Sequence, residues 1–246
     1  MDLIVTRSKL PDIEREKLVQ LSQPTLWDEE GKEALEYLRI VRGFSDDSIK
    51  AFKLGYVPHW VKRDNGLFHE FAGRILIPIY NQYDNLIAVS SRDWREGAER
   101  KFHHESFSKA HFLFGLNIAK KAILERSQSI IVEGEFDVIS LHNRGFTFTV
   151  GALGSSLQLY QLAILSRYCS EIYLLFDSDT AGKQATERSV KIGVNNQFFD
   201  VFDIKLIPVS LPAGDDPDDF IKKNGVNSLV SLLRKHREEF NKLRGV

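Results

Sequence analysis

Short apolar runs that alternate with helix-like segments, and that end in acidic residues, constrain this chain most strongly. Residues 130–132 and 172–176 are rich in β-branched and other apolar side chains, as in strands that are buried on both faces. Glu133 follows the first run directly, and Asp177 and Asp179 follow the second. We expect an α/β module, because alternating strands and helices typically form a mostly parallel sheet with right-handed crossovers.

The expected elements of this module follow one another at short intervals. The pattern predicts strands at 129–132, 147–150, 172–176 and 202–207, and helices at 136–143, 157–167 and 181–192. In an open α/β sheet, ligands bind at the carboxyl ends of the strands. Carboxylates gathered at such an edge repel one another, so we expect a cation among them. Mg²⁺ or Mn²⁺ is the simplest choice for hard oxygen ligands.

The spacing of the acids supports a shared site. Asp177 and Asp179 are two residues apart, so an extended chain directs both side chains to one side. Asp137 lies one helical turn beyond Glu133, and residues 216–218 form an Asp-Pro-Asp turn. Any one of these acids alone could instead cap a helix or lie in a solvated loop. Their clustering at three points favours the metal site.

At these residues the chain resembles the Toprim fold of topoisomerases and primases. The motif EG-x-x-D begins at Glu133 and D-x-D-x-A-G begins at Asp177, and the later Asp-Pro-Asp is similar specifically to bacterial-type DNA primases. The resemblance implies that Glu133 is a general acid/base or a metal partner, and that two or more divalent ions bind nearby. The metal-holding residues that it implies are Glu133, Asp137, Asp177, Asp179, Asp216 and Asp218. We expect no zinc, because Cys169 is the single cysteine.

A basic, aromatic segment precedes the acidic module. The stretches GRILIPIY, SSRDW and RKFHHESFSKAHFLFGL resemble the primase segment that lines the template and nucleotide groove. By this match, the residues expected to contact nucleic acid or nucleotide are Arg74, Arg92, Lys101 and Lys109. Each alone would be read as a solvated surface residue. His103 and His104 depart from the family, which commonly has asparagine or another small polar residue there.

The chain divides into four predicted segments. Residues 1–56 form a helical entry, 57–126 a basic α+β subdomain, 127–212 the Rossmann-like Toprim subdomain, and 213–246 a metal-binding turn with C-terminal helices. We expect helices at 12–20 and 29–40, a short helix capped by Ser45, and a hairpin of strands at 74–80 and 86–91. Pro78 indicates an edge or a bulge. In the tail, Gly225 ends one helix and Asn227 caps another.

The sequence leaves the role of one glycine–serine turn open. The glycine–serine turn at 151–156 either binds phosphate through backbone N–H groups or is a tight turn only. It is not a Walker loop, because no Gly-Lys-Ser/Thr follows.

No apolar run approaches the ~20 residues of a membrane span, so we expect no membrane partner. We expect a cytoplasmic protein of the replisome, or of the host cytoplasm if a phage encodes it.

The resemblance predicts the catalytic core of a DNA primase, which joins ribonucleotides into short primers on a DNA template by two-metal nucleotidyl transfer. Its implied partners are single-stranded DNA, nucleoside triphosphates and a replicative helicase. A separate chain supplies the zinc-binding role, or the protein works without it. The first rival is a Toprim-family metal-dependent nuclease with the same acids. A topoisomerase fragment and a non-catalytic DNA-binding module fit less well, because the former needs a tyrosine-bearing domain and the latter does not need the acids.

Overall fold

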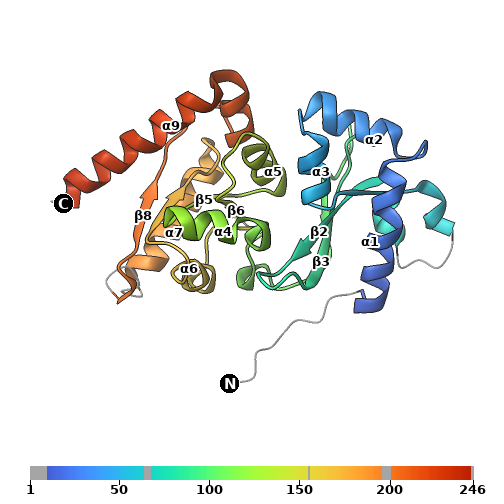
Figure 1. Cartoon of the computed structure of the whole chain (residues 1–246), viewed down its shortest axis with the longest axis horizontal. Coiled ribbons are helices and arrows are strands. Elements are labelled where there is room, and N and C mark those ends of the chain that lie inside the picture. The colour runs from blue at the N-terminus through green and yellow to red at the C-terminus, as the bar shows by residue number, and fades with distance from the viewer. Residues whose placement is uncertain (1–9, 64–67, 155, 196–200, 245–246) are drawn as a thin grey trace. The chain divides into compact units, whose positions relative to one another are not determined.

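A computed structural model describes the chain except for residues 1–9, 64–67, 155, 196–200 and 245–246. The described residues form two compact units, Met1–Ser108 and Lys109–Val246, each with its own sheet (Figure 1). None of the helices in the described part of the chain combines the length and the apolar character that a membrane span requires.

Unit 1 is built on an antiparallel sheet of order β1-β2-β3-β4. Its strands are β1 (Gly55–Val57), β2 (Arg74–Tyr80), β3 (Leu86–Arg92) and β4 (Phe102–His104). The predicted hairpin of β2 and β3 is confirmed, and the side chain of Asn81 closes its turn by accepting the backbone N–H groups of Tyr83 and Asn85. The sequence did not predict β4, whose three residues lack a recognisable alternation.

Pro78 lies in a central strand of this sheet, because β2 pairs with β1 on one side and with β3 on the other. The pairing with β1 stops at Leu76, two residues before the proline. The register with β3 shifts between Ile79 and Tyr80. The missing N–H of Pro78 therefore falls where one neighbour has ended and a bulge follows, as its lack of a donor requires.

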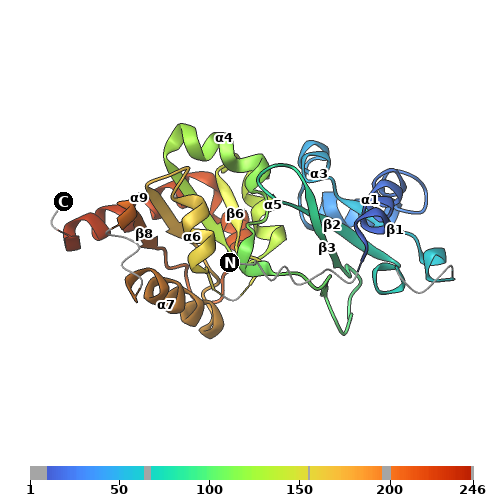
Figure 2. The ribbon, with the colours of Figure 1, turned by 90° about the horizontal axis from the view of Figure 1, so that it is seen from below.

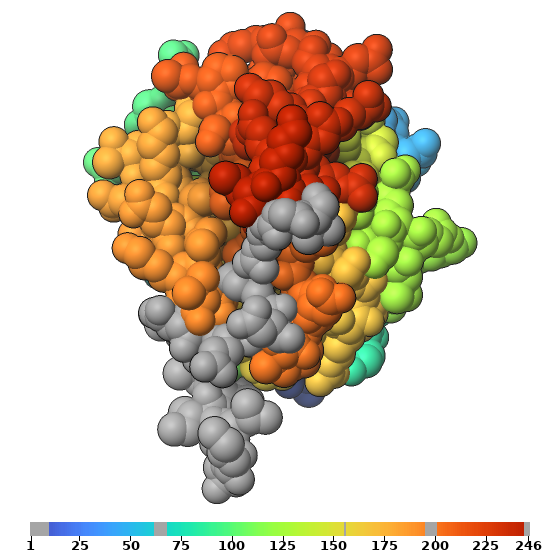
Figure 3. All heavy atoms as spheres, turned by 90° about the vertical axis from the view of Figure 1, so that its left-hand side faces the viewer, coloured from blue at the N-terminus to red at the C-terminus, as the bar shows by residue number. Residues whose placement is uncertain are grey.

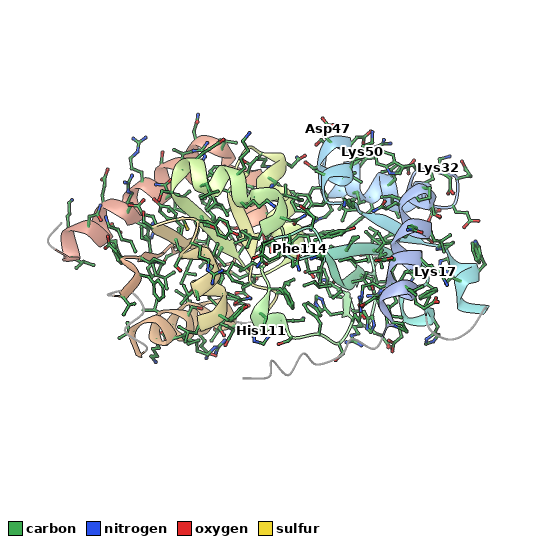
Figure 4. All side chains as sticks on the ribbon, turned by 60° about the horizontal axis from the view of Figure 1, so that its bottom comes forward. Lys17, Lys32, Asp47, Lys50, His111 and Phe114 are labelled. Carbon is green, nitrogen blue, oxygen red and sulfur yellow. The ribbon has the colours of Figure 1, made fainter. Side chains whose placement is uncertain are left out.

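Helices cover the sheet of unit 1 and supply its core. They are α1 (Asp12–Leu26), α2 (Lys32–Glu36), the π-helix η1 (Tyr37–Val41) and α3 (Asp46–Ala51), with short 3₁₀ turns η2 (His59–Arg63) and η3 (His69–Phe71). Leu18 and Val19 of α1 pack with Val57, Leu76 and Val89 of the strands. Lys17 and Lys32 project outward from the first two helices (Figure 4).

Two helix predictions for unit 1 need correction and one holds. Helix α1 continues to Leu26 rather than ending near residue 20, and the single helix expected at 29–40 is an α-helix that passes into a π-helix. The predicted cap of α3 is confirmed, because the Ser45 hydroxyl accepts the backbone N–H of Ser48 at 3.2 Å.

Unit 2 is built on a parallel sheet of order β6-β5-β7-β8, as the alternating pattern predicted. The strands are β5 (Gln128–Val132), β6 (Thr149–Gly151), β7 (Glu171–Leu174) and β8 (Lys205–Pro208). The helices are α4 (Leu116–Arg126), α5 (Glu135–Asn143), α6 (Leu159–Leu165), α7 (Thr180–Asn195) and α9 (Pro217–Arg244), with a 3₁₀ turn η4 (Lys109–His111). Strand β8 begins three residues later than expected, because residues 201–202 are helical.

The connections of unit 2 explain which helix covers which face. From β5 the chain moves to β6 on one side and then crosses back to β7 and β8 on the other. Right-handed crossovers therefore place α5 on one face and both α6 and α7 on the opposite face (Figures 1 and 2). Helix α9 packs on α5 and on β8. Gly225, with φ of 80°, interrupts α9, which confirms the predicted end of a helix there.

Candidate active site

The strand order of unit 2 places two carboxylates at one edge of the sheet. The direction of the connections reverses between β5 and β7, and in open α/β sheets ligands bind outside the carboxyl ends of strands at this point. Glu133 directly follows β5, and Asp177 follows β7. The two strands stay together to their ends, since the Leu175 N–H donates to the Ile131 carbonyl at 2.9 Å. Glu133 and Asp177 therefore lie beyond the ends of neighbouring strands, at the same edge of the sheet.

Glu133 and Asp177 each keep one buried carboxylate oxygen without a hydrogen-bond partner in the described structure, Oε1 and Oδ1 respectively. Burial raises the pKa of Glu133 to about 7, and the charge of Asp177 is the second cause of this rise. Burial, followed by the charges of Asp216 and Asp179, raises the pKa of Asp177 to about 6. The site therefore gathers carboxyl groups that repel one another when they are ionised, and a divalent cation would relieve this repulsion.

Asp179 and Asp216 complete the charged group from the starts of two helices. Asp179 Oδ1 accepts the Gly182 N–H at 2.7 Å at the beginning of α7, and Asp216 Oδ1 accepts the Asp219 N–H at 2.7 Å at the beginning of α9. Each residue is thus a helix N-cap. For the second oxygen of each, the described residues offer no hydrogen bond. Asp179 and Asp216 therefore cap their helices, and their charges also raise the pKa of Asp177.

Backbone contacts hold the two acidic loops together. The Ser178 N–H donates to the Asp215 carbonyl at 3.1 Å, so the loop after β7 is tied to the loop after β8. Gly182 makes the first turn of α7 possible at this position, because a Cβ there would lie 2.1 Å from the Asp177 carbonyl oxygen. The glycine of D-x-D-x-A-G therefore permits a helix to begin directly behind Asp177.

Asp137 and Asp218 stand differently from these four acids. Asp137 lies in the first turn of α5, and its Oδ2 lies 2.9 Å from the place where a Cβ of Gly134 would be. Asp218 is 1% exposed, accepts Lys222 Nζ at 2.7 Å and bonds to the Ser140 hydroxyl. Of the Asp-Pro-Asp pair, Asp216 is the residue whose charge acts on Asp177.

Lys109 lies in unit 2, in the turn before α4. Burial lowers the pKa of its ammonium group, while the charge of Glu135 acts in the opposite direction. Glu135, 3% exposed and in the first turn of α5, is a residue that the sequence analysis did not select. Its only signal in the sequence is its place directly after the Glu133-Gly134 pair.

The segment that carries Lys109 is fixed by contacts with α6 and β6. The fully buried Gln161 donates from Nε2 to the carbonyls of Lys109 at 3.2 Å and Phe112 at 2.7 Å. Phe114 exchanges two backbone hydrogen bonds with Gly151, and both it and the nearby His111 are labelled in Figure 4. Gln161 holds this segment, and no local sequence pattern reveals that role, because Lys109 and Phe112 lie about 50 residues away. Residue 155 of the glycine–serine turn lies outside the described residues.

The predicted cationic residues of unit 1 differ in accessibility. Arg74 is 9% exposed, and its guanidinium donates to Ser91 Oγ at 3.0 Å and to the carbonyls of Arg100 and Lys101 at 2.8 and 2.9 Å. It therefore holds the loop before β4. Arg92 donates to the Tyr37 hydroxyl at 3.1 Å, whereas the Lys101 side chain is exposed. The nucleotide-binding roles of all four cations stay predictions.

The two histidines of β4 do not share a ligand position, because successive strand residues point to opposite faces. His103 is 9% exposed and its Nε2 lies 3.1 Å from Glu70 Oε2. Across the described ranges, we find no group of three or more His, Cys, Asp or Glu side chains arranged to hold a metal ion. Mg²⁺ typically binds through one or two carboxylates together with water and substrate phosphates.

Two family models match the chain. Residues 59–120 match the N-terminal domain of the DNA primase catalytic core, and residues 130–221 match a Toprim-like domain. A DNA primase of Synechococcus elongatus is 32% identical, and the match covers 88% of this chain and 35% of that protein. The chain thus spans about a third of the length of this curated relative.

Solved structures share the fold. The zinc-binding and RNA polymerase domains of the Aquifex aeolicus primase match with a TM-score of 0.75 and 27% identity, over 92% of this chain and 62% of that one. A DnaG primase catalytic domain bound to single-stranded DNA matches with a TM-score of 0.81 and 23% identity, over 91% of this chain and 78% of that one.

Proposed function

The chain is a DnaG-like primase catalytic core with a Toprim-like domain, and from this premise we propose that it synthesises short RNA primers on a DNA template. One observation carries the proposal beyond the family. The buried, unpartnered oxygens of Glu133 and Asp177 lie at the switch point of the parallel sheet, with raised carboxyl pKa values of about 7 and about 6. Nucleotidyl transfer needs such a charged edge, and a purely structural sheet does not.

We propose that Mg²⁺ or Mn²⁺ binds among Glu133, Asp177, Asp179 and Asp216. When bound, these ions would activate the attacking 3′-hydroxyl and stabilise the leaving pyrophosphate. Asp177 Oδ1 and Glu133 Oε1 are the two oxygens that lack a protein partner, so they are the first choice as ligands. For Asp137 and Asp218, the proposal rests on the motif alone.

Glu133 has a second capacity, because a carboxyl group with a pKa of about 7 exchanges its proton near neutral pH. We propose the role of general acid/base towards the attacking hydroxyl as the alternative to metal binding for Glu133, because a bound cation would lower this pKa. Lys109 in unit 2 and Arg92 and Lys101 in unit 1 would bind phosphates of nucleotide or template. Single-stranded DNA as template is supported by its presence in the DnaG catalytic domain of similar fold. A replicative helicase and a separate zinc-binding protein remain proposed partners.

Primer synthesis on single-stranded circular DNA, with labelled nucleoside triphosphates and Mg²⁺ or Mn²⁺, tests this function. Asp177→Asn and Glu133→Gln keep the size of the side chain and remove its charge, and we expect each to lower the rate by about 100-fold or more. The control is Glu187→Gln, which makes the same chemical change at an exposed acid of α7. Wild-type rates in both site variants would contradict the proposal. Metal-dependent loss of the template without synthesis, abolished by the same variants, would indicate a nuclease.

A further inference from the structure

A second concave site lies in unit 2, and we call it the arginine groove. It has a volume of about 430 Å³ and is lined by four arginines, three aromatic rings and an apolar stretch of α9. Arg126 and Gln128 mark the amino-terminal end of β5, and Phe146 and Phe148 precede β6. The groove therefore begins at the sheet edge opposite the carboxyl ends that carry the acids, and it is not part of the candidate active site.

The floor of the groove combines aromatic rings with two polar side chains, each of which makes a hydrogen bond. Gln128 donates from Nε2 to Glu171 Oε2 at 2.8 Å, and the Tyr173 hydroxyl lies 3.4 Å from the same carboxylate oxygen. The guanidinium of Arg126 lies over the ring of Phe148, 4.9 Å from its centroid. The Tyr173 hydroxyl and one N–H of Gln128 are therefore engaged, and one aromatic face is already covered.

One wall of the groove is an apolar stripe on the surface helix α9, whose C-terminal part crosses the outside of unit 2 (Figure 3). Val226, Val230 and Leu233 are spaced by four and three residues, so they lie on one face of the helix. The two valines are 43% and 41% exposed. Exposed β-branched side chains next to aromatic rings form a surface on which an apolar side chain of another molecule can be buried.

Cations surround this apolar surface. Arg234 has no hydrogen-bond or ion-pair partner among the residues that the structure describes. Arg237 lies 3.2 Å from Glu171, and Arg144 Nη1 lies 4.0 Å from Asp218. Together with Arg126, these side chains give the rim an excess of positive charge over an uncharged floor.

We propose that the arginine groove binds an acidic, amphipathic peptide segment of a partner protein. Its apolar side chain would pack between the phenylalanine rings and the valines of α9, and its carboxylates would pair with Arg234 and the neighbouring arginines. Guanidinium groups bind carboxylates through two parallel hydrogen bonds, and amphipathic segments commonly dock in apolar grooves. A nucleotide would also bring negative charge, but the exposed valines of α9 favour an apolar side chain over the polar edge of a base.

Fluorescence anisotropy with the full chain tests the proposal. The probe is a short labelled peptide in which aspartates alternate with leucine and phenylalanine, and its control peptide has every aspartate replaced by asparagine. We expect saturable binding of the acidic peptide only. Arg234→Ala should weaken it about tenfold, whereas Lys235→Ala should not. Lys235 is the matched control, because it carries the same charge one residue away and does not line the arginine groove.

A thiol-specific label locates the binding site independently. Cys169 is the single cysteine, 6% exposed, and burial raises the pKa of its thiol to about 12, so it reacts poorly. A Val230→Cys variant therefore offers one reactive position at the groove, and Ser231→Cys offers one beside it that faces away from the groove. We expect the acidic peptide to protect the thiol at 230 from labelling and to leave the thiol at 231 reactive.

Several outcomes would overturn the proposal. They are an absence of saturable peptide binding, an equal loss in Arg234→Ala and Lys235→Ala, and protection of both engineered thiols. Protection of the thiol at 230 by ATP, with no protection by the acidic peptide, would also reject it and would identify a nucleotide site instead.

Discussion

Glu105 in unit 1 and the acid pair Glu133 and Asp177 in unit 2 are carboxylates with buried oxygens in opposite surroundings. In unit 1, Glu105 is 4% exposed and is fully engaged: Arg15 Nε lies 2.9 Å from its Oε2, and the backbone N–H groups of Leu10 and Val89 donate to it at 3.1 Å. In unit 2, Glu133 Oε1 and Asp177 Oδ1 are buried and have no hydrogen-bond partner among the described residues. The first arrangement stabilises a fold, whereas the second leaves charge available for a ligand.

The energetic consequence differs in sign. Removing one partner of a satisfied buried ion pair leaves the other charge unpaired and is costly. Removing a carboxylate that other carboxylates repel relieves the folded state. The same substitution of an acid by a neutral residue should therefore destabilise the protein at Glu105 and spare or stabilise it at Glu133 and Asp177.

The largest effect is expected at Glu105. Glu105→Ala leaves Arg15 buried at 2% exposure without its main partner, and we expect a loss of about 3–5 kcal/mol in the free energy of unfolding. Urea denaturation measures it. The control is Asp46→Ala, which removes the partner of the exposed Arg39 and should leave the midpoint unchanged. A loss at Glu105 no greater than at Asp46 would remove the basis of the comparison.

Divalent metal should stabilise the wild-type protein. At a concentration about 100 times the dissociation constant, Mg²⁺ or Mn²⁺ should add about 2.7 kcal/mol, visible as a higher melting temperature that EDTA reverses. Asp177→Asn should lose most of this gain, because it removes a ligand oxygen that has no protein partner. An equal metal-dependent shift in the variant would show that the ion binds elsewhere.

The two aspartates of the Asp-Pro-Asp motif should separate in the same assay. Asp218→Asn weakens the bonds to Lys222 and Ser140, so we expect a loss of about 2 kcal/mol that metal does not change. Asp216→Asn keeps the helix cap, since asparagine caps as well as aspartate, but should reduce the metal-dependent shift. The reverse pattern would make Asp218 the metal ligand and Asp216 the structural residue.

The smallest effect is a pH dependence without metal. In the folded protein the pKa values of Glu133 and Asp177 are raised to about 7 and about 6. At a pH between the ordinary carboxyl pKa and these raised values, the folded state therefore binds more protons than the unfolded state. Their contribution to stability is therefore greatest in acid and is lost as the pH rises through about 7. Allowing for solvent screening, we expect about 1 kcal/mol less stability at about pH 8 than at about pH 5.

Thermal melts of the wild type and Glu133→Gln over this pH range isolate that contribution, because all other titrating groups are shared. The difference between the two proteins should favour the variant progressively as the pH rises, and saturating Mg²⁺ should abolish it. A difference that is flat with pH would mean that Glu133 titrates as it does in the unfolded chain.

Local patterns in the sequence predicted most of unit 2. Strands buried on both faces leave apolar runs that are easy to identify, as at β5 and β7, and glycines mark helix ends wherever φ is positive, as at Gly225. The patterns failed for β4, which is short and contains two histidines, and at the start of β8. These elements depend on pairing with distant strands, which a window of neighbouring residues does not contain.

The candidate site shows the same division. The motifs around Glu133 and Asp177 placed acids at strand ends, and the parallel sheet brings those ends together. The sequence contained no signal that Gln161 would hold the segment of Lys109, or that Glu105 would pair with Arg15, 90 residues away. Those partners are chosen by packing, because burial makes each polar group find whichever partner the fold brings within reach.

By itself, the sequence determined the order of strands and helices in unit 2 and the positions of its acids at the strand ends, because both follow from the spacing of neighbouring residues. Only the tertiary structure decided which carboxylates are satisfied. In the folded protein Asp218 bonds to Lys222 and Ser140, and Glu105 pairs with Arg15. Glu133 Oε1 and Asp177 Oδ1 are buried and have no hydrogen-bond partner among the described residues. A carboxylate's charge state depends on burial and on groups distant in the chain, and these are properties of the folded protein.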